Sequence, residues 1–271
     1  MSRIASAFAA VRARNDVALV PFFMAGDPDL TTTRELVRAA VAEGADLIEL
    51  GVPFSDPMAD GPVIQRAAAR AIAAGTALPR VLELVADLRA DVSVPIVLFG
   101  YYNPFFRYGI EAVARDAEAA GADGFLCVDL PPEESAELRS AARARGLDVI
   151  ALLAPTTPRA RIRTIAAAAS GFLYFVSVLG VTGARDALPL ELPELVRGAR
   201  EATDLPIGVG FGVQRADQAA WIAGFADAVI VGSAIARLVE EGSGGAVNRV
   251  ADFVRGLRDA MRGVSAARAG A

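Results

Sequence analysis

Residues 206–231 read PIGVGFGVQRADQAAWIAGFADAVIV, and this stretch decides the fold. A short apolar run, Pro206 to Gly210, is followed by a segment of helical period, Gln214 to Ile222, and then by a second apolar run, Ala226 to Val231. Apolar runs of this length without alternation are typical of parallel strands that are covered on both faces. The stretch therefore predicts a β-α-β unit with a right-handed crossover.

The same alternation continues along nearly the whole chain. We expect eight strands, at Ala18 to Met24, Asp46 to Leu50, Pro95 to Gly100, Gly124 to Val128, Asp148 to Leu153, Phe172 to Ser177, Pro206 to Gly210 and Ala226 to Val231. Helical segments separate or follow them, at Thr31 to Glu43, Leu78 to Ala90, Gly109 to Ala120, Pro132 to Arg145, Pro158 to Ala167, Leu192 to Ala202, Gln214 to Ile222, Ser233 to Glu240 and Gly245 to Arg262. Eight such units in 271 residues predict an α/β protein with a closed (β/α)8 barrel, the TIM barrel.

An open doubly wound sheet is the structural alternative. That fold usually carries G-x-G-x-x-G after its first strand, where this chain has Gly26-Asp27-Pro28-Asp29. The apolar stretch Ile4 to Val11 runs directly into arginines and fits an extra amphipathic N-terminal helix better than a signal peptide. Because no linker divides the chain and no apolar run is long enough to span a bilayer, we expect a single cytoplasmic domain over residues 1–271.

The composition excludes several kinds of chemistry. The chain has no histidine and no lysine, since all 27 basic residues are arginine, and its net charge is −5. It therefore lacks a Schiff-base lysine, a Walker lysine and a Ser-His or Cys-His pair. With Cys127 as the one cysteine, we expect neither a disulfide nor a metal site. Acid/base chemistry must come mainly from Asp, Glu and Tyr, and the mild acidity argues against nucleic acid as a partner.

Glu49 is the most informative residue, because it interrupts the apolar run Leu47 to Leu50 near the end of a predicted strand. Active sites of (β/α)8 barrels lie at the carboxyl ends of the strands. A buried carboxylate is costly unless it is paired or functional, and the nearest arginines in the sequence, Arg38 and Arg66, belong to helical segments. We interpret Glu49 as a catalytic residue.

The following loop, Gly51 to Pro62, is long for a connection of this kind and contains three prolines, which suggests a positioned lid. Asp60 lies at its end, just before a helix expected to begin at Val63. Its carboxylate could cap that helix or act in catalysis, and the spacing does not decide between the two.

Glycines gather after the last three strands, in Gly180-Val181-Thr182-Gly183, Gly210-Phe211-Gly212 and Gly232-Ser233. In (β/α)8 barrels a phosphate site is commonly built from the loops after strands seven and eight and the start of a short extra helix, here Ser233 to Glu240. Backbone N–H groups at such a helix start bind phosphate without lysine. The cluster therefore predicts a site for a small phosphorylated ligand.

The sequence LGVPFSDPMADGP, residues 50–62, resembles the signature of the tryptophan synthase α subunit. The resemblance covers nearly the whole chain, including residues 22–28, 100–104, 128–131, 154–156, 180–183, 210–212 and 231–233. It implies a (β/α)8 lyase that cleaves indole-3-glycerol phosphate to indole and glyceraldehyde 3-phosphate, a retro-aldol reaction. Retro-aldol enzymes usually use a lysine imine or a metal held largely by histidines. Here the indole ring can take up the electrons once it is protonated, so two carboxylates suffice.

The resemblance also implies roles for individual residues. Glu49 protonates the indole ring carbon from a partly neutral carboxyl group, and an ionised Asp60 binds the indole N–H. The remaining site residues are Tyr174 with the catalytic pair; Phe22, Tyr101, Leu126, Thr182 and Phe211 against the substrate; and Gly183, Gly212, Gly232 and Ser233 around the phosphate. The family implies no cofactor in this chain and an α2β2 heterotetramer, with pyridoxal phosphate in the partner β subunit.

Two other functions remain open. An isomerase acting on phosphoribosyl anthranilate, or on its histidine-pathway analogue, would share the glycines but not the loop from Pro53 to Pro62. A chain that binds indole-3-glycerol phosphate only as an allosteric partner would have no need of Glu49, Asp60 and Tyr174. An assay with that substrate separates the three interpretations.

Overall fold

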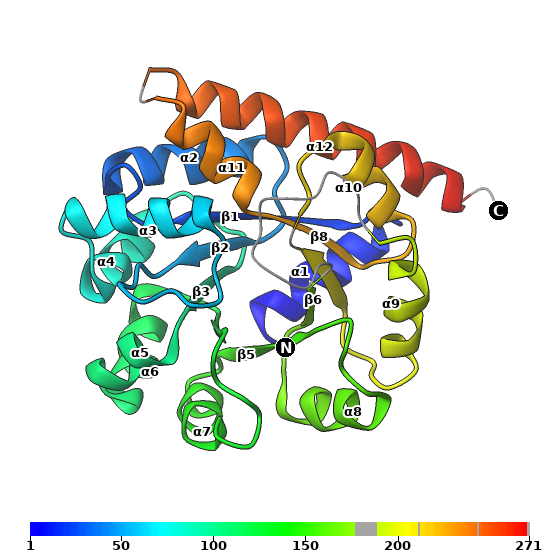
Figure 1. Cartoon of the computed structure of the whole chain (residues 1–271), viewed down its shortest axis with the longest axis horizontal. Helices are drawn as coiled ribbons and strands as arrows, with labels where there is room; N and C mark the ends of the chain where they lie inside the picture. The colour runs from blue at the N-terminus through cyan, green and yellow to red at the C-terminus, as the bar shows by residue number, and fades with distance from the viewer. Residues whose placement is uncertain (177–188, 211, 243, 270–271) are drawn as a thin grey trace.

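The computed structural model describes residues 1–176, 189–210, 212–242 and 244–269. Eight parallel strands close into a barrel in sequence order, β1 through β8, with β8 paired to β1 (Figure 1). The predicted (β/α)8 barrel is therefore confirmed. The strands are β1 (Ala18–Met24), β2 (Ile48–Gly51), β3 (Ile96–Gly100), β4 (Gly124–Cys127), β5 (Asp148–Leu153), β6 (Leu173–Val176), β7 (Ile207–Gly210) and β8 (Ala228–Val231).

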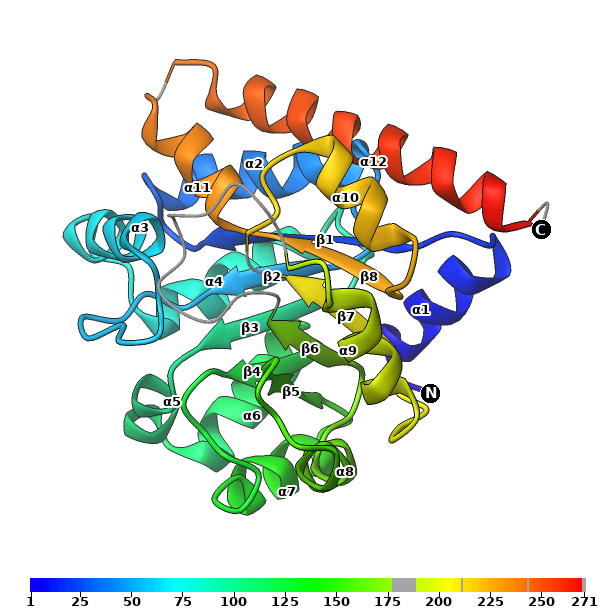
Figure 2. The same cartoon turned by 45° about the vertical axis from the view of Figure 1, so that its right-hand side comes forward.

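Helices surround this barrel, as two views 45° apart show (Figures 1 and 2). They are α1 (Arg3–Ala13), α2 (Leu30–Ala42), α3 (Pro62–Ala73), α4 (Leu78–Leu88), α5 (Tyr102–Tyr108), α6 (Ile110–Ala120), α7 (Ala136–Ala144), α8 (Arg159–Ala168), α9 (Leu192–Arg200), α10 (Ala216–Ala223), α11 (Ser233–Glu240) and α12 (Ala246–Ala269). The expected extra N-terminal helix and the short helix after the last strand are confirmed as α1 and α11. Helix α5 was not predicted, and α12 continues beyond its predicted end at Arg262.

Local sequence signals explain where several helices begin. The Asp29 carboxylate accepts the Thr32 N–H at 2.7 Å and caps α2, while the Ser2 hydroxyl caps α1 by accepting the Ala5 N–H at 3.2 Å. Proline occupies the first turn of α3, α4 and α9, where its missing N–H would have no helical partner.

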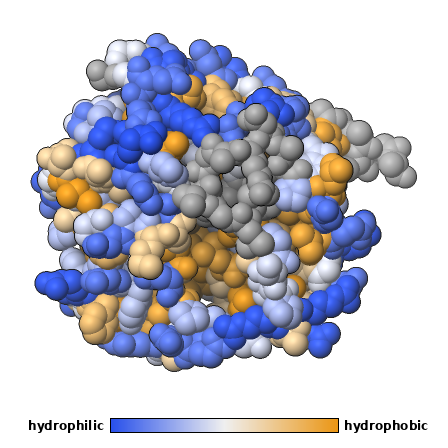
Figure 3. Space-filling view, viewed as in Figure 1, coloured by the Kyte–Doolittle hydropathy of each residue, from blue (hydrophilic) through white to orange (hydrophobic). Residues whose placement is uncertain are grey.

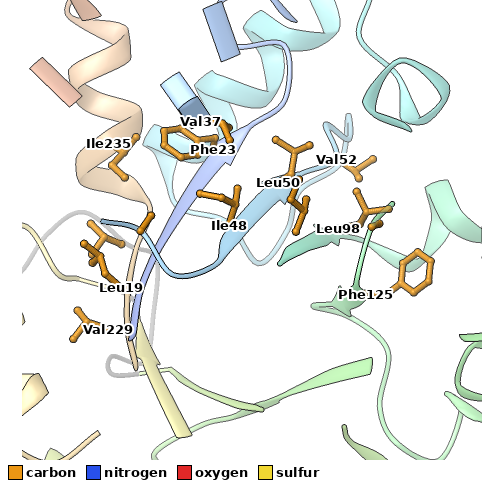
Figure 4. Close-up of a cluster of buried hydrophobic side chains, with 14 of the residues drawn as sticks. Leu19, Phe23, Val37, Ile48, Leu50, Val52, Leu98, Phe125, Val229 and Ile235 are labelled. Atoms are coloured by element: carbon orange, nitrogen blue, oxygen red, sulfur yellow. The ribbon is translucent and has the colours of Figure 1, made fainter. Parts of the chain in front are cut away.

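The strands separate two apolar cores. One fills the space between the strands and the helices, and includes Leu19, Phe23, Ile48 and Leu50 (Figure 4). The other lies inside the barrel, where alternate strand residues such as Val20 and Val97 point inward. Because Glu49 pairs in register with Phe22 on β1 and Val97 on β3, both of the interior core, it also faces the interior.

Helix α1 closes the end of the barrel at which the strands begin. Its Ile4, Phe8 and Val11 are buried in the interior core, and the centre of the Phe8 ring lies 5.6 Å from that of Phe172, the residue before β6. With this end closed, the interior opens at the carboxyl ends of the strands.

Aspartates and arginines hold the strands together at the closed end. Asp46, Asp123 and Asp227 each precede a strand and accept an N–H from the neighbouring strand, at 2.9 Å from Leu19, 2.7 Å from Ile96 and 2.8 Å from Ile207. Each also pairs with at least one arginine. The predicted strand start at Asp46 is therefore two residues early, because this side chain binds β1 instead of entering β2.

The face of the molecule that is seen in the view of Figure 1 is mostly hydrophilic. Hydrophobic residues gather there in a central hollow next to the grey atoms (Figure 3). Cys127 is buried among apolar residues, as expected, and burial raises the pKa of its thiol. No helix among the described residues has the length and apolar character to cross a membrane.

Candidate active site

A pocket of about 450 Å³ opens at the carboxyl ends of the strands. Nine described residues line it: Phe22, Glu49, Asp60, Ile64, Phe99, Tyr174, Gly212, Gly232 and Ser233. They come from β1, β2, β3 and β6, from the loops after β2 and β7, and from the starts of α3 and α11. Seven of them were expected from the sequence, so residues far apart in the chain meet at one site.

Glu49 lies in the pocket with only 1% of its surface exposed. No described residue makes a hydrogen bond to either of its carboxylate oxygens. Burial without a compensating charge raises its pKa well above the ordinary value of 4.5. Glu49 can therefore hold a proton at a pH where an exposed glutamate is ionised, as a general acid requires.

Asp60 is the second carboxylate of the pocket, and burial raises its pKa to about 6. A hydrogen bond from the Tyr101 hydroxyl acts in the opposite direction and favours the ionised form. The same hydroxyl accepts the Ala59 N–H at 2.9 Å, so Tyr101 fixes the end of the loop that carries Asp60. Near pH 7.5 Asp60 is mainly ionised.

The structure bears on one of the two interpretations of Asp60, the helix cap. The N-cap of α3 is Gly61, and no side chain makes a capping hydrogen bond there. The capping interpretation is wrong, and the Asp60 carboxylate is left facing the pocket.

Aromatic rings form one wall of the pocket. The centre of the Phe99 ring lies 5.2 Å from the centre of the Phe22 ring, with the two rings edge to face. It lies 6.4 Å from the centre of the Tyr174 ring. Glycines make room for this wall, because a Cβ on Gly51 would lie 2.5 Å from the Phe22 ring and one on Gly210 would lie 2.1 Å from the Tyr174 hydroxyl. The wall suits a flat apolar ring.

A second part of the pocket is polar, in contrast to the aromatic wall. Gly212, Gly232 and Ser233 line it, and their backbone groups are close to the pocket. Gly212 has a φ of +91°, which a residue with a side chain rarely adopts, and Gly232 is the N-cap of α11. The first N–H groups of α11 have no helical partners and lie beside the pocket, where they can bind an anion. Thr182, Gly183 and Phe211, which the sequence also placed here, lie outside the described residues.

Two expected residues lie near the pocket without lining it. Tyr101 is buried behind Asp60, and Leu126 is fully buried in the barrel interior, in register with Phe99. Sequence reasoning missed Phe99 and Ile64, although the two-residue period from Val97 could have placed Phe99 on the inner face. Among the described residues, no three His, Cys, Asp or Glu side chains are placed to hold a metal ion.

Two carboxyl groups with raised pKa values, an aromatic wall and a helix start meet at the mouth of a (β/α)8 barrel, and together they define a class of enzyme. The site is that of a barrel enzyme that uses carboxylate acid/base chemistry on a substrate with an apolar ring and an anionic group. Comparison with known proteins gives the family. The model of the family "Tryptophan synthase alpha chain" matches residues 8–262.

Relatives agree over nearly the full length. The tryptophan synthase alpha chain of Geobacter sulfurreducens is 53% identical, with 96% of this chain and 99% of the relative covered. That of Synechococcus elongatus is 51% identical, with 96% and 97% covered. The crystal structure of tryptophan synthase subunit alpha from Legionella pneumophila superposes with a TM-score of 0.91 at 38% identity, covering 97% of this chain and 99% of that chain.

This chain belongs to the tryptophan synthase alpha chain family. The family comprises carbon-carbon lyases of tryptophan biosynthesis, which cleave indole-3-glycerol phosphate and need no cofactor in the alpha chain. The fold and the activity expected from the sequence are confirmed, and the isomerase and the weakly active binding subunit are not favoured.

Proposed function

We propose that Glu49 is the acid/base catalyst of indole-3-glycerol phosphate cleavage. The observation that carries this proposal is its buried carboxyl group in the pocket, without a hydrogen-bond partner among the described residues. The protonated carboxyl group donates its proton to the ring carbon that bears the glycerol phosphate chain. The resulting carboxylate then takes the proton of the adjacent chain hydroxyl as the carbon–carbon bond breaks. Indole and an aldehyde leave, and Glu49 is protonated again.

Asp60 stabilises the charge that this step creates. Protonation of the ring carbon places positive charge on the indole nitrogen, and an ionised carboxylate accepting the N–H stabilises that charge most strongly when water is excluded. The hydrogen bond from Tyr101 supports the ionised form and fixes the end of the Asp60 loop. Two carboxylates with different protonation states thus divide the work.

The aromatic wall and the α11 helix start bind the two ends of the substrate. We assign the indole ring to the space beside Phe22, Phe99 and Tyr174, whose rings are within contact distance of one another. The phosphate then lies at Gly212, Gly232 and Ser233, near the free N–H groups of α11. Gly183 belongs to the same phosphate site, and Thr182, Phe211, Tyr101 and Leu126 complete the surroundings of the substrate.

The partner of this chain is a tryptophan synthase β subunit, in an α2β2 heterotetramer. A solved structure of tryptophan synthase from Mycobacterium tuberculosis contains a chain that matches this one with a TM-score of 0.89 at 38% identity. Met58, in the loop before Asp60, and Phe106, in α5, are exposed apolar side chains on segments that follow β2 and β3, and such exposure suits contact with a protein partner. In this family the β subunit carries pyridoxal phosphate, and this chain has no lysine that could anchor that cofactor.

Docking of the partner acts on the loops around the pocket. Residues 53–60, with Asp56, connect β2 to the exposed rim, and residues 180–193, with Thr182, follow β6. A partner that favours the closed form of these loops raises turnover by excluding water. We further propose that residues 1–271 act as a single domain in the cytoplasm.

The test is an assay of the isolated chain with indole-3-glycerol phosphate, with and without its cognate β subunit. We expect indole release by the chain alone, faster release in the complex, and tighter complex formation when glycerol phosphate is present. A chain that isomerises phosphoribosyl anthranilate but releases no indole would contradict the proposal. So would equal turnover alone and in the complex, combined with an affinity that glycerol phosphate does not change.

A further inference from the structure

Four charged side chains outside the pocket form one connected ion cluster, which we call the Asp27 cluster: Asp27, Arg66, Arg70 and Glu240. The two carboxylate oxygens of Asp27 bind Arg70, at 2.7 Å from Nε and 2.8 Å from one terminal nitrogen. The other terminal nitrogen of Arg70 lies 2.9 Å from Glu240. Arg66 also binds Glu240 through two nitrogens, at 2.6 and 2.8 Å.

The cluster joins three elements that carry the active site. Arg66 and Arg70 are on α3, Glu240 is the last residue of α11, and Asp27 lies in the loop after β1. Helices α3 and α11 lie side by side in both views (Figures 1 and 2). Asp60 lies immediately before α3, and Gly232 and Ser233 form the start of α11. The cluster thus links α3, which follows Asp60, to α11, which begins at the proposed phosphate site.

The charges of the cluster depend on one another. An acidic residue at the carboxyl end of a helix is disfavoured by the helix dipole, yet Glu240 occupies that place on α11 and faces two arginines. These arginines hold the pKa of Glu240 at about 2, so it stays ionised. Asp27 is 3% exposed, and its carboxylate would be left buried without a partner if Arg70 moved away. The cluster therefore links two different helices, whereas the exposed ion pair of Arg197 and Glu194 lies within the single helix α9.

We propose that the Asp27 cluster positions the substrate by fixing α11 relative to α3, and so the phosphate relative to Asp60. None of its members lines the pocket, so they are positioning residues and act through the starts of the two helices. Small displacements between a bound group and a catalytic group have large effects on rate and binding. The proposal rests on the proposed function, because it takes the start of α11 as the phosphate site.

Glu240→Gln is the sharpest test, because it releases α11 and leaves the ion pair between buried Asp27 and half-buried Arg70 in place. We expect the KM for indole-3-glycerol phosphate and the dissociation constant of glycerol phosphate both to rise by about fivefold or more, with kcat lowered less. The double variant Arg66→Gln/Glu240→Gln is expected to bind glycerol phosphate no more weakly than Glu240→Gln does. Arg66 acts through its contact with Glu240, and the single variant already removes the charge of that contact.

Glu43→Gln is the matched control. Glu43 binds Arg255 through two nitrogens, both at 2.8 Å, and this pair joins the end of α2 to α12 away from the pocket. The side-chain exposures match, at 24% for Glu43 and 51% for Arg255 against 30% for Glu240 and 53% for Arg66. A purely structural role would lower the melting temperatures of both variants alike and leave both KM values near that of the wild type.

Equal KM values and equal glycerol phosphate affinities for Glu240→Gln and Glu43→Gln would overturn the positioning role. If the wild type itself released no indole, the proposed function would be the part that failed. Binding of glycerol phosphate or inorganic phosphate to the two variants still decides the inference in that case. Weaker binding by Glu240→Gln alone would support it.

Discussion

The buried carboxylates at the two ends of the barrel have opposite surroundings. At the closed end, Asp123 accepts the Ile96 N–H at 2.7 Å and pairs with Arg89 at 2.5 Å and Arg3 at 2.6 Å. At the open end, Glu49 is more deeply buried and receives no hydrogen bond from a described residue. Asp123 directly precedes β4, whereas Glu49 lies within β2 and faces the barrel interior, so the two carboxylates are buried at opposite ends of the barrel.

This contrast supports the proposal that Asp123 stabilises the barrel and that Glu49 acts on the substrate. A carboxylate with a full set of donors compensates for its own burial, whereas one without donors destabilises the fold and persists where its altered pKa is useful. Substitutions at the closed end should therefore change stability, and those at the open end should change turnover, with the largest effect at Glu49.

Glu49→Gln should lower kcat for indole-3-glycerol phosphate cleavage by about 10³-fold, because the amide keeps the shape of the side chain and cannot transfer a proton. Glycerol phosphate should still bind, and the circular dichroism spectrum should be unchanged. Turnover within tenfold of the wild type would remove Glu49 from the mechanism.

Asp123→Ala should lower the free energy of unfolding by about 3 kcal/mol, because it removes the acceptor of the Ile96 N–H and the carboxylate that pairs with the largely buried Arg89 guanidinium. Urea unfolding measures this loss. Below the unfolding transition kcat should match that of the wild type. A selective loss of kcat in a stably folded variant would mean that the closed end also takes part in catalysis.

Asp60→Asn should lower kcat by about 10²-fold with little loss of stability, because the Asp60 side chain does not cap α3. In the wild type, kcat/KM should fall as the pH is lowered through about 6, where Asp60 takes up a proton. That dependence should be absent from the variant. If kcat/KM of Asp60→Asn still fell as the pH is lowered through about 6, the fall would have to come from another titrating group.

Glu49→Gln should also stabilise the folded protein at alkaline pH, because the amide carries no charge that must be buried. The pKa of Glu49 is raised on folding, so the folded state binds a proton more tightly than the unfolded state. Wild-type stability relative to the variant should therefore fall as the pH rises from 4.5 through the folded-state pKa. Urea unfolding at several pH values gives this difference, and a constant difference would indicate a normal pKa.

Most of the fold could be predicted from the sequence, because each strand is a short apolar run between helical segments. Helix α5 could not, since residues 102–108 read YNPFFRY, with an asparagine and a proline that do not favour a helix. Its start is fixed by tertiary contacts: the Tyr102 N–H donates to Asp129 at 2.8 Å, and the buried Phe105 ring packs on Phe125. Such contacts join distant parts of the chain and leave no local signal.

The same reasoning explains which site residues could be predicted. Glu49 stands out because a carboxylate in an apolar run is unusual, and the glycines stand out because they gather after successive strands. Phe99 and Ile64 are apolar residues in apolar surroundings, so only the assembled barrel distinguishes them from the core. The hydrogen bond from the Ala59 N–H to the Tyr101 hydroxyl joins residues that follow two different strands. No rule of sequence spacing predicts such a contact.

The protonation state of Glu49 tests the central claim most directly. The carboxyl carbon of this residue can be followed by carbon-13 NMR in protein labelled at glutamate, with its signal identified by its absence from Glu49→Gln. In the unliganded chain we expect a titration midpoint well above 4.5, since no described residue compensates for the burial of the charge. A midpoint at or below 4.5 would mean that burial does not raise the pKa of Glu49, and would contradict its role as the proton donor.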